Sequence, residues 1–164
     1  MKIKKFNDMY LAELQELVSV EGQLAESLLS MAEVASLPAL KSALVRHRHD
    51  TEMQKERLES ILQKHGASPR QHVDQGMQAL VHETGKMLTM VEGNDLRDAA
   101  LVASAQRLKH YEIAAYGIAA AFAGQLGLRD DQRMLHDSLE EEKQADAMLN
   151  EFAKREVNPN ALAA

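Results

Sequence analysis

The chain has 164 residues, of which 45% are hydrophobic and 27% are charged, a balance typical of one globular domain with a substantial core. Its formal net charge of -6 offers no general attraction to nucleic acid or to an anionic membrane, so neither is expected as a partner. Cysteine is absent, which excludes disulfides, thiolate catalysis, iron–sulfur clusters and thiol-bound zinc, and leaves oxygen and imidazole as the ligands for any metal.

Helix signals divide the first part of the chain into two long predicted helices. Strong helix formers dominate the composition, and no strand pattern competes with them. The first helix is predicted over residues 6–35, where apolar residues from Tyr10 to Met31 repeat at three- and four-residue steps. Ser36 and Pro38 predict a break, and a second helix follows over residues 37–65, with Gly66 as its C-terminal cap.

Three further helices are predicted in the rest of the chain. Ser68 and Pro69 indicate the start of a shorter third helix over residues 69–91. Asn94 precedes a long fourth helix over residues 94–125, and Asp130 begins a fifth over residues 130–156, after which the end of the chain is expected to fray. Two antiparallel hairpins joined by a crossover with a short helix predict an all-α four-helix bundle, as a single domain over residues 1–164.

Four carboxylates interrupt otherwise apolar stripes, one on each of the long helices: Glu21, Asp50, Glu112 and Glu142. An ionised carboxylate in a dry core is very unfavourable unless it takes up a proton, forms an ion pair or binds a metal. A single interior carboxylate is more often a hydrogen-bonded or partly exposed side chain. Four of them, with few basic residues at inward positions to pair with them, predict a metal site.

The spacing within two helices extends this candidate site. Gln54 lies one turn after Asp50, and Asp146 lies one turn after Glu142, so each helix presents two ligand groups on one face. Together with the single carboxylates of the other two long helices, these groups are sufficient to hold two divalent cations at the centre of the bundle. Hard oxygen ligands with at most one or two imidazoles favour iron or manganese over copper.

Three other side chains are candidate neighbours of these ligands. His47 lies on the core face three residues before Asp50, so it is a metal ligand, a hydrogen-bond partner of a ligand or a core histidine, and the second role is favoured. His110 lies two residues from Glu112 on a different face. Tyr116 is one turn beyond Glu112, where it donates a hydrogen bond to the carboxylate, acts as a local redox buffer or, as we favour, is a buried tyrosine with one hydrogen bond.

The sequence also bears on localisation. No stretch approaches the roughly 20 apolar residues needed to span a bilayer. The basic residues Lys2, Lys4 and Lys5 are not followed by the apolar run of a secretory signal. We therefore expect a cytoplasmic protein.

Four sequence stretches carry a family resemblance. They are VEGQL at residues 20–24, the segment 47–54 with its His-x-x-Asp-Thr-x-x-Gln pattern, HYEIAAYG at residues 110–117 and LEEEK at residues 139–143. On these stretches the chain resembles the bacterial YciE/YciF family of ferritin-like proteins, over about residues 4–157. The family pattern has Glu where this chain has Asp50 and Gln or His at the position of Gln54, and Asp146 matches only some relatives.

The resemblance implies a ferritin-like bundle, usually an oligomer, with a two-metal centre and an association with stress responses. A homo-oligomer, with a dimer favoured, is therefore expected. Our first hypothesis is a di-iron or di-manganese protein that reacts with peroxide or dioxygen in a peroxidase-like, catalase-like or oxidase reaction. Because no cysteine-bound iron can deliver electrons, turnover would need an external reductant or a dismutation.

Two alternatives remain open, and the sequence does not decide whether the protein is an enzyme. One is a non-enzymatic stress protein that binds metal for structure or storage, or that acts through oligomer and partner contacts. The other is an adaptor bundle without metal, which predicts raised carboxylate pKa values and a stability that improves on acidification.

Overall fold

The computed structural model describes residues 2–164, which are helical over most of their length. The elements in chain order are α1 (Phe6–Val34), α2 (Pro38–Lys64), α3 (Gln75–Met90), α4 (Asn94–Gln125), α5 (Arg129–Phe152), the π-helical segment η1 (Ala153–Val157) and α6 (Asn158–Ala163). No strand occurs among residues 2–164. The predicted all-α class is confirmed.

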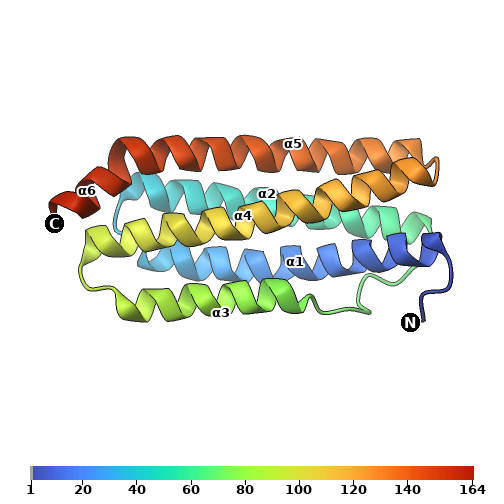
Figure 1. Cartoon of the computed structure of the whole chain (residues 1–164), viewed down its shortest axis with the longest axis horizontal. Helices are drawn as coiled ribbons and strands as arrows, with labels where there is room; N and C mark the ends of the chain where they lie inside the picture. Colours follow the sequence, from blue (N-terminus) through green and yellow to red (C-terminus); the bar gives the residue numbers. More distant parts are fainter. Residues whose placement is uncertain (1) are drawn as a thin grey trace.

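The four long helices α1, α2, α4 and α5 lie side by side along the long axis of the molecule (Figure 1). α1 packs against α2 and α4 packs against α5, so each consecutive pair is an antiparallel hairpin. The shorter α3 lies in the crossover between the hairpins and packs on α1 and α4. This is the predicted four-helix bundle with one long connection, the arrangement of ferritin-like proteins.

The interior is divided into two apolar clusters, one toward each end of the bundle. One cluster contains Val20, Leu24, Leu44, Leu108 and Leu149. The other contains Leu14, Leu17, Leu58, Ala119 and Leu139. Between the two apolar clusters, each long helix contributes at least one buried polar side chain. These side chains form a polar cluster in the middle of the bundle.

The break between α1 and α2 is stabilised from a distant helix. The Asp98 carboxylate of α4 accepts hydrogen bonds from the backbone N–H groups of Ser36, at 2.8 Å, and Leu37, at 2.9 Å. These N–H groups precede the first turn of α2, where the helix offers no acceptor for them. The predicted break at Ser36 and Pro38 is confirmed, and Asp98 provides the cap that the local sequence lacks.

α3 begins at Gln75, six residues later than the predicted start at residue 69. The segment before it is held against α1: the Gln15 amide donates to the Ser68 carbonyl at 2.7 Å, and the Gln23 amide donates to the Asp74 carbonyl at 2.9 Å. The Asp74 carboxylate then accepts from the Met77 N–H at 2.6 Å and caps the helix. These contacts with α1 override the local helix-start signal of Ser68 and Pro69.

The end of the chain also differs from the prediction. Residues 158–163 form α6 instead of fraying, and η1 connects it to α5 without a break. Pro159 lies in the first turn of α6, and it has no backbone N–H to donate to a carbonyl of the preceding turn in η1. Val157 and Ala153 are buried in the apolar core, which fixes η1 against the bundle.

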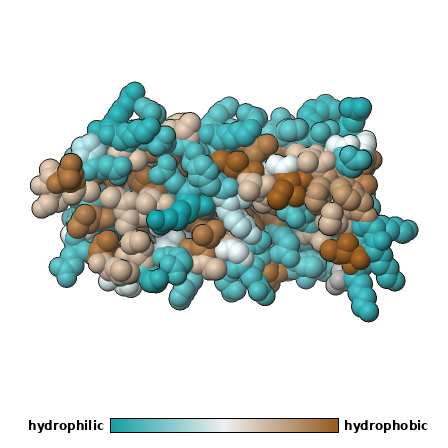
Figure 2. Space-filling model, in the orientation of Figure 1, coloured by the Kyte–Doolittle hydropathy of each residue, from teal (hydrophilic) through white to brown (hydrophobic). Residues whose placement is uncertain are grey.

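Hydrophilic and hydrophobic residues are interspersed over the face of the molecule shown in Figure 2. No helix within residues 2–164 has the length and apolar character required to cross a membrane.

Candidate metal centre

The polar cluster between the two apolar clusters draws side chains from all four long helices. Its members are Glu21 of α1, His47 and Gln54 of α2, Lys109, Glu112 and Tyr116 of α4, and Glu142 of α5. Each is at most 7% exposed. The inward positions predicted for the three glutamates, His47 and Gln54 are therefore confirmed.

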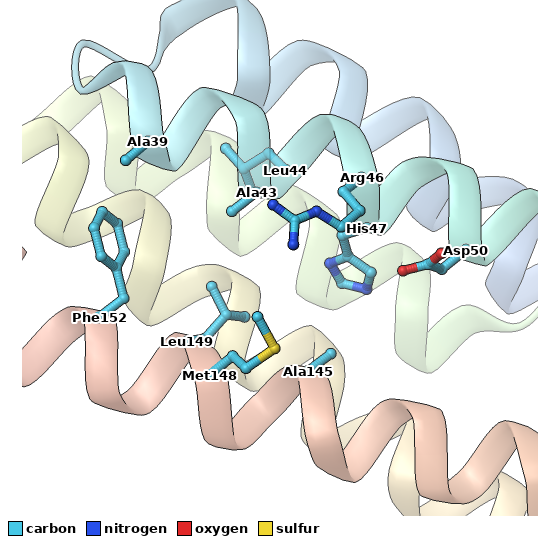
Figure 3. A pocket seen from close by; sticks show the side chains of 10 residues that line it. All are labelled: Ala39, Ala43, Leu44, Arg46, His47, Asp50, Ala145, Met148, Leu149 and Phe152. Carbon is cyan, nitrogen blue, oxygen red and sulfur yellow. The ribbon is translucent and has the colours of Figure 1, made fainter.

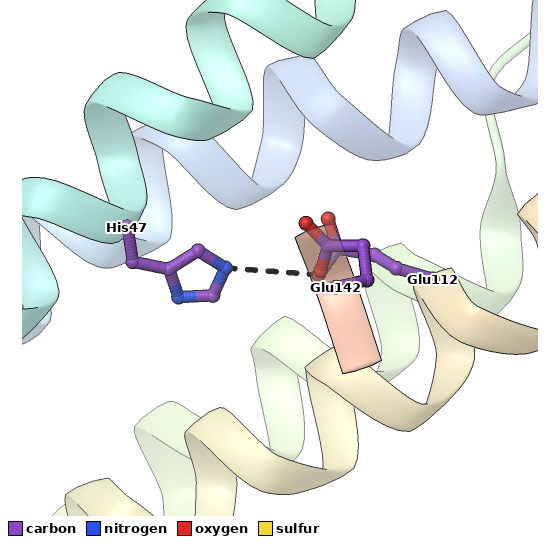
Figure 4. A group of neighbouring side chains, drawn as sticks. All are labelled: His47, Glu112 and Glu142. Carbon is purple, nitrogen blue, oxygen red and sulfur yellow. Dashed lines mark ion pairs between the residues drawn. The ribbon is translucent and has the colours of Figure 1, made fainter. Parts of the chain in front are cut away.

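His47, Glu112 and Glu142 form the closest group of candidate ligands. One ligand atom from each lies within 4.8 Å of the others, although the three residues come from three different helices. Figure 4 shows the His47 ring pointing toward the two carboxylates, with its Nε2 3.8 Å from a Glu112 oxygen. This position fits a metal ligand, one of the three roles that the sequence leaves open for His47.

Lys109 lies in the middle of this group, and the sequence reasoning missed it. Its Nζ is fully buried, contacts Nε2 of His47 and Oε2 of Glu142, and lies 3.5 Å from Oε2 of Glu112. The expectation that the carboxylates have few inward basic partners is wrong at this position. Lys109 follows Ala105 by four residues and precedes Glu112 by three, which places it on the same helix face as both.

Glu21 completes the carboxylate cluster on the side of α1. The Tyr116 hydroxyl donates a hydrogen bond to Oε1 of Glu21, instead of to the nearer carboxylate in sequence, Glu112. Burial raises the pKa of Glu21 well above its ordinary value, and the charges of Glu112 and Glu142 raise it further. Tyr116 and Lys109 oppose that rise but do not reverse it.

Gln54 contributes its amide nitrogen to the cluster. Its Nε2 donates to Oε1 of Glu142 at 2.8 Å and to Oε2 of Glu141 at 3.0 Å. Arg57, on the same helix, forms an ion pair with Glu141 at 3.1 Å at the edge of the bundle. In this arrangement Gln54 orients a candidate ligand, and its predicted role as a ligand stays a prediction.

Asp50, Asp146 and His110 lie outside the buried group. Asp50 is exposed, because the inward stripe of α2 passes through Thr51, so its predicted inward orientation is wrong. Asp146 is half-buried, with a side chain 20% exposed, and one of its oxygens lies 3.4 Å from Nε2 of the exposed His110. The ligand roles of Asp50 and Asp146 stay predictions without support from this geometry.

Burial and neighbouring charges set the protonation of the remaining ligands. Burial, followed by the charge of Glu112, raises the pKa of Glu142 to about 7 against the opposing charge of Lys109. Burial and Lys109 lower the pKa of His47 to about 3, so the imidazole is neutral, the form that binds metal. Burial alone would lower the pKa of Lys109, but the carboxylates of Glu112 and Glu142 outweigh it and raise that pKa.

The cluster has less positive charge and fewer hydrogen-bond donors than its three carboxylates require. Three buried carboxylates face one ammonium group, which leaves two negative charges when all of them are ionised. Neither oxygen of Glu112 accepts a hydrogen bond, nor does Oε2 of Glu21, within residues 2–164. Buried polar atoms are rarely left without a partner. Carboxylate oxygens with a neutral imidazole are a donor set that fits a divalent metal ion.

A largely apolar pocket of about 240 Å³ lies between α2 and α5, beside His47. Ala43 of α2 and Leu149 and Phe152 of α5 line it, and His47 lies in its wall (Figure 3). Arg46 and Asp50 place charged groups beside the same pocket. The pocket brings a small molecule within reach of one candidate ligand.

A second buried carboxylate group lies at one end of the bundle. Asp131 of α5 is fully buried and accepts hydrogen bonds from Tyr10 at 3.2 Å, Lys64 at 2.9 Å and His65 at 2.6 Å. Burial alone would raise the pKa of Asp131, but the hydrogen bonds from His65 and Lys64 lower it. Asp131 follows Asp130, the predicted start of the fifth helix, and no sequence pattern indicates this group.

Comparison with known proteins finds one family over most of the chain. Residues 5–162 match the family described as a domain of unknown function, DUF892. Protein YciF of Escherichia coli K12 is 35% identical over 162 residues, which cover 98% of this chain and 98% of YciF. The crystal structure of the E. coli stress protein YciF aligns with a TM-score of 0.89 at 34% identity, over 95% of this chain and 99% of that one.

Two further solved structures share the fold. YcfI from Rhodopseudomonas palustris, for which a structural role has been suggested, has a TM-score of 0.88 at 34% identity, over 91% of this chain and 95% of that one. A protein from Xanthomonas campestris has a TM-score of 0.74 at 18% identity, with 92% of each chain covered. The latter is a likeness of fold alone.

Proposed function

We propose a function for this chain, which belongs to the DUF892 family of YciF-type proteins. The proposal is that it is a stress-associated protein whose buried centre binds a divalent metal ion. The word stress belongs to the description of YciF, and its extension to this chain is part of the proposal. The ligands in the proposal are His47, Glu112 and Glu142. The protein is proposed to act in the cytoplasm as a homo-oligomer, with a dimer favoured.

One observation carries the proposal: Glu112 is fully buried, and neither of its oxygens accepts a hydrogen bond within residues 2–164. A buried carboxylate that accepts no hydrogen bond and has only the Lys109 ammonium group at 3.5 Å is unfavourable, and a divalent ion held jointly with His47 and Glu142 would supply more positive charge than that one ammonium group. Carboxylate and imidazole together suit iron or manganese, which we propose as the native ions.

The number of ions is a separate part of the proposal. The sequence predicts two, and the structure assembles a three-residue donor set for one. Glu21, whose Oε2 has no hydrogen-bond donor within residues 2–164, is the natural ligand of a second ion. That second ion stays a prediction, because Asp50 and Asp146 lie outside the buried group.

A redox-active ion at this centre would supply electrons to peroxide or dioxygen, and we propose one of these as the substrate. The residues of the chain serve that chemistry in two ways. The pocket between α2 and α5 would admit a small molecule to the side of the centre occupied by His47. Tyr116 holds Glu21 in place through its hydrogen bond. Electrons would come from an external reductant, or the reaction would be a dismutation.

The test is metal analysis together with peroxide consumption on protein purified without chelators. Wild type is compared with Glu112→Gln, which removes one charge at nearly constant volume, and with the surface control Glu83→Gln, because Glu83 pairs with Lys86 on exposed α3. We expect iron or manganese in wild type and in the control and its loss, together with loss of peroxide consumption, in Glu112→Gln. Absence of metal from all three proteins would contradict the proposal.

A non-enzymatic role is the second candidate, and Lys109 is the observation that favours it. An ammonium group already lies among the candidate ligands, so the cluster has partial charge compensation without any metal. A structural role has been suggested for the relative YcfI. Metal bound without peroxide consumption would support this candidate over the enzyme.

A further inference from the structure

We propose that Lys109 competes with the metal ion for its binding site, because its ammonium group contacts the same donor atoms that the ion requires. The centre therefore contains either the ammonium group of Lys109 or a metal ion, but not both. This inference rests on the proposed metal-binding function. It concerns how that function is limited by Lys109, a residue outside the predicted set of ligands.

The geometry of Lys109 carries the inference. Its Nζ contacts Nε2 of His47 and Oε2 of Glu142 and lies 3.5 Å from Oε2 of Glu112. These are the three residues whose ligand atoms lie within 4.8 Å of one another. An ion bound by all three would therefore take the position that the ammonium group occupies.

The chemistry of the donors leads to the same conclusion. An ammonium group can only donate hydrogen bonds, so Nε2 of His47 accepts from Lys109 through the lone pair that would otherwise bind a metal. The carboxylate oxygens of Glu112 and Glu142 likewise face one cation. Two cations at contact distance, buried among the same atoms, would repel each other strongly.

The surroundings leave Lys109 no solvent to move into without a rearrangement. Its side chain is fully buried, and Glu112 and Glu142 beside it are at most 1% exposed. Metal uptake must therefore break the contacts of Lys109 with His47 and Glu142. The affinity of the native centre for a divalent ion is reduced by the free energy of those contacts, and a neutral residue at position 109 relieves that competition.

The experiment titrates Mn²⁺ into metal-free protein and measures the free ion by electron paramagnetic resonance. Lys109→Met removes the charge and retains much of the volume. Lys109→Gln is a second neutral variant, available if the methionine variant does not fold. The control is Lys64→Met. Lys64 forms an ion pair with the buried Asp131, which lies about 16 Å along α5 from Glu142.

We expect either neutral variant at position 109 to bind Mn²⁺ at least tenfold more tightly than wild type, while Lys64→Met binds as wild type does. The same variants should show a larger rise in Tm on addition of Mn²⁺. Tighter binding by the variants when wild type binds no Mn²⁺ would also support the competition, and would count against metal binding by the native chain.

Two results would overturn the inference, and they differ in what they leave standing. If wild type binds Mn²⁺ and the neutral variants bind it equally or more weakly, Lys109 is not a competitor, and the proposed function survives. If neither wild type nor the variants bind Mn²⁺, both the competition and the proposed metal site fail.

Discussion

The bundle buries carboxylates in two regions, and the regions differ in how well those groups are paired. Asp131 at one end accepts hydrogen bonds from three different side chains. At the centre, three carboxylates share one ammonium group, and Glu112 accepts no hydrogen bond within residues 2–164. A fully paired carboxylate stabilises the fold, whereas an incompletely paired cluster is suited to bind a cation.

The pH dependence of stability should show the largest difference between the two regions. The raised pKa of Glu142, about 7 against an ordinary 4.5, means that its protonation stabilises the folded, metal-free chain at acid pH and that this contribution is lost as the pH rises through 7. The contribution of His47 to stability changes with pH in the opposite direction below pH 6.5, because the pKa of His47 is lowered to about 3. A difference between two proteins is therefore needed to isolate Glu142.

We predict that, as the pH rises from 4.5 to 7.5, the free energy of unfolding of Glu142→Gln increases relative to that of wild type by on the order of 3 kcal/mol, when both proteins are metal-free. Urea denaturation at several pH values measures this change. The matched control Asp131→Asn should show a nearly constant difference from wild type over that range, because the lowered pKa of Asp131 places its titration at more acid pH. A constant difference for Glu142→Gln as well would remove the distinction between the regions.

Metal affinity should separate the regions next. Substitution of a residue that only orients a metal ligand typically lowers affinity by about 10- to 100-fold, so loss of a direct ligand in Glu112→Gln should lower it by about 100-fold or more. Asp131→Asn should leave it unchanged. Equilibrium dialysis against Mn²⁺ provides the measurement. Equal affinities in the two variants would show that the central cluster is not where the ion binds.

Much of the fold followed from periodicity and helix-end signals, which are local. The start of α3 did not, because Gln15 and Gln23 on α1 hold residues 68–74 in a non-helical conformation. The capping of α2 by Asp98 likewise depends on a residue 61 positions away in sequence from Leu37. Contacts of this kind arise only when the helices pack together.

The candidate site was predictable in its glutamates but not in its counter-ion. Glu21, Glu112 and Glu142 interrupt apolar stripes, so helical periodicity alone placed them inside. Lys109 shares the face of Glu112, but a lysine is so rarely buried that its sequence position alone does not indicate a buried counter-ion. Helical spacing from His47 allows either position 50 or position 51 on the inner face of α2, and in the structure Thr51 is buried and Asp50 is exposed.

The stability of the metal-free chain offers a third comparison. Asp131→Asn should lower the free energy of unfolding at pH 7 by about 2 kcal/mol, because Tyr10 and His65 lose a charged acceptor. Glu112→Gln should lower it less, because Glu112 accepts no hydrogen bond within residues 2–164 and Lys109 keeps its closer contact with Glu142. Chemical denaturation of both variants without metal checks the pair. A larger loss in Glu112→Gln would mean that the central cluster is the better paired one.

The smallest expected difference concerns two buried tyrosines. Tyr116→Phe and Tyr10→Phe each remove one hydroxyl that donates to a carboxylate, Glu21 in the first case and Asp131 in the second. Each should lower stability by about 1 kcal/mol. Tyr116→Phe alone should also weaken Mn²⁺ binding, by a few-fold, because Glu21 lies in the cluster. Thermal unfolding with and without Mn²⁺ distinguishes them, and an identical response to the ion would contradict the assignment of Glu21 to the centre.

Anomalous diffraction at the manganese edge, from crystals of the wild-type chain soaked in Mn²⁺, tests the existence of the cation site most directly. The account predicts a peak within bonding distance of His47, Glu112 and Glu142, with the Lys109 ammonium group moved away from those atoms. Manganese found only on the surface, with Lys109 still in contact with His47 and Glu142, would contradict it.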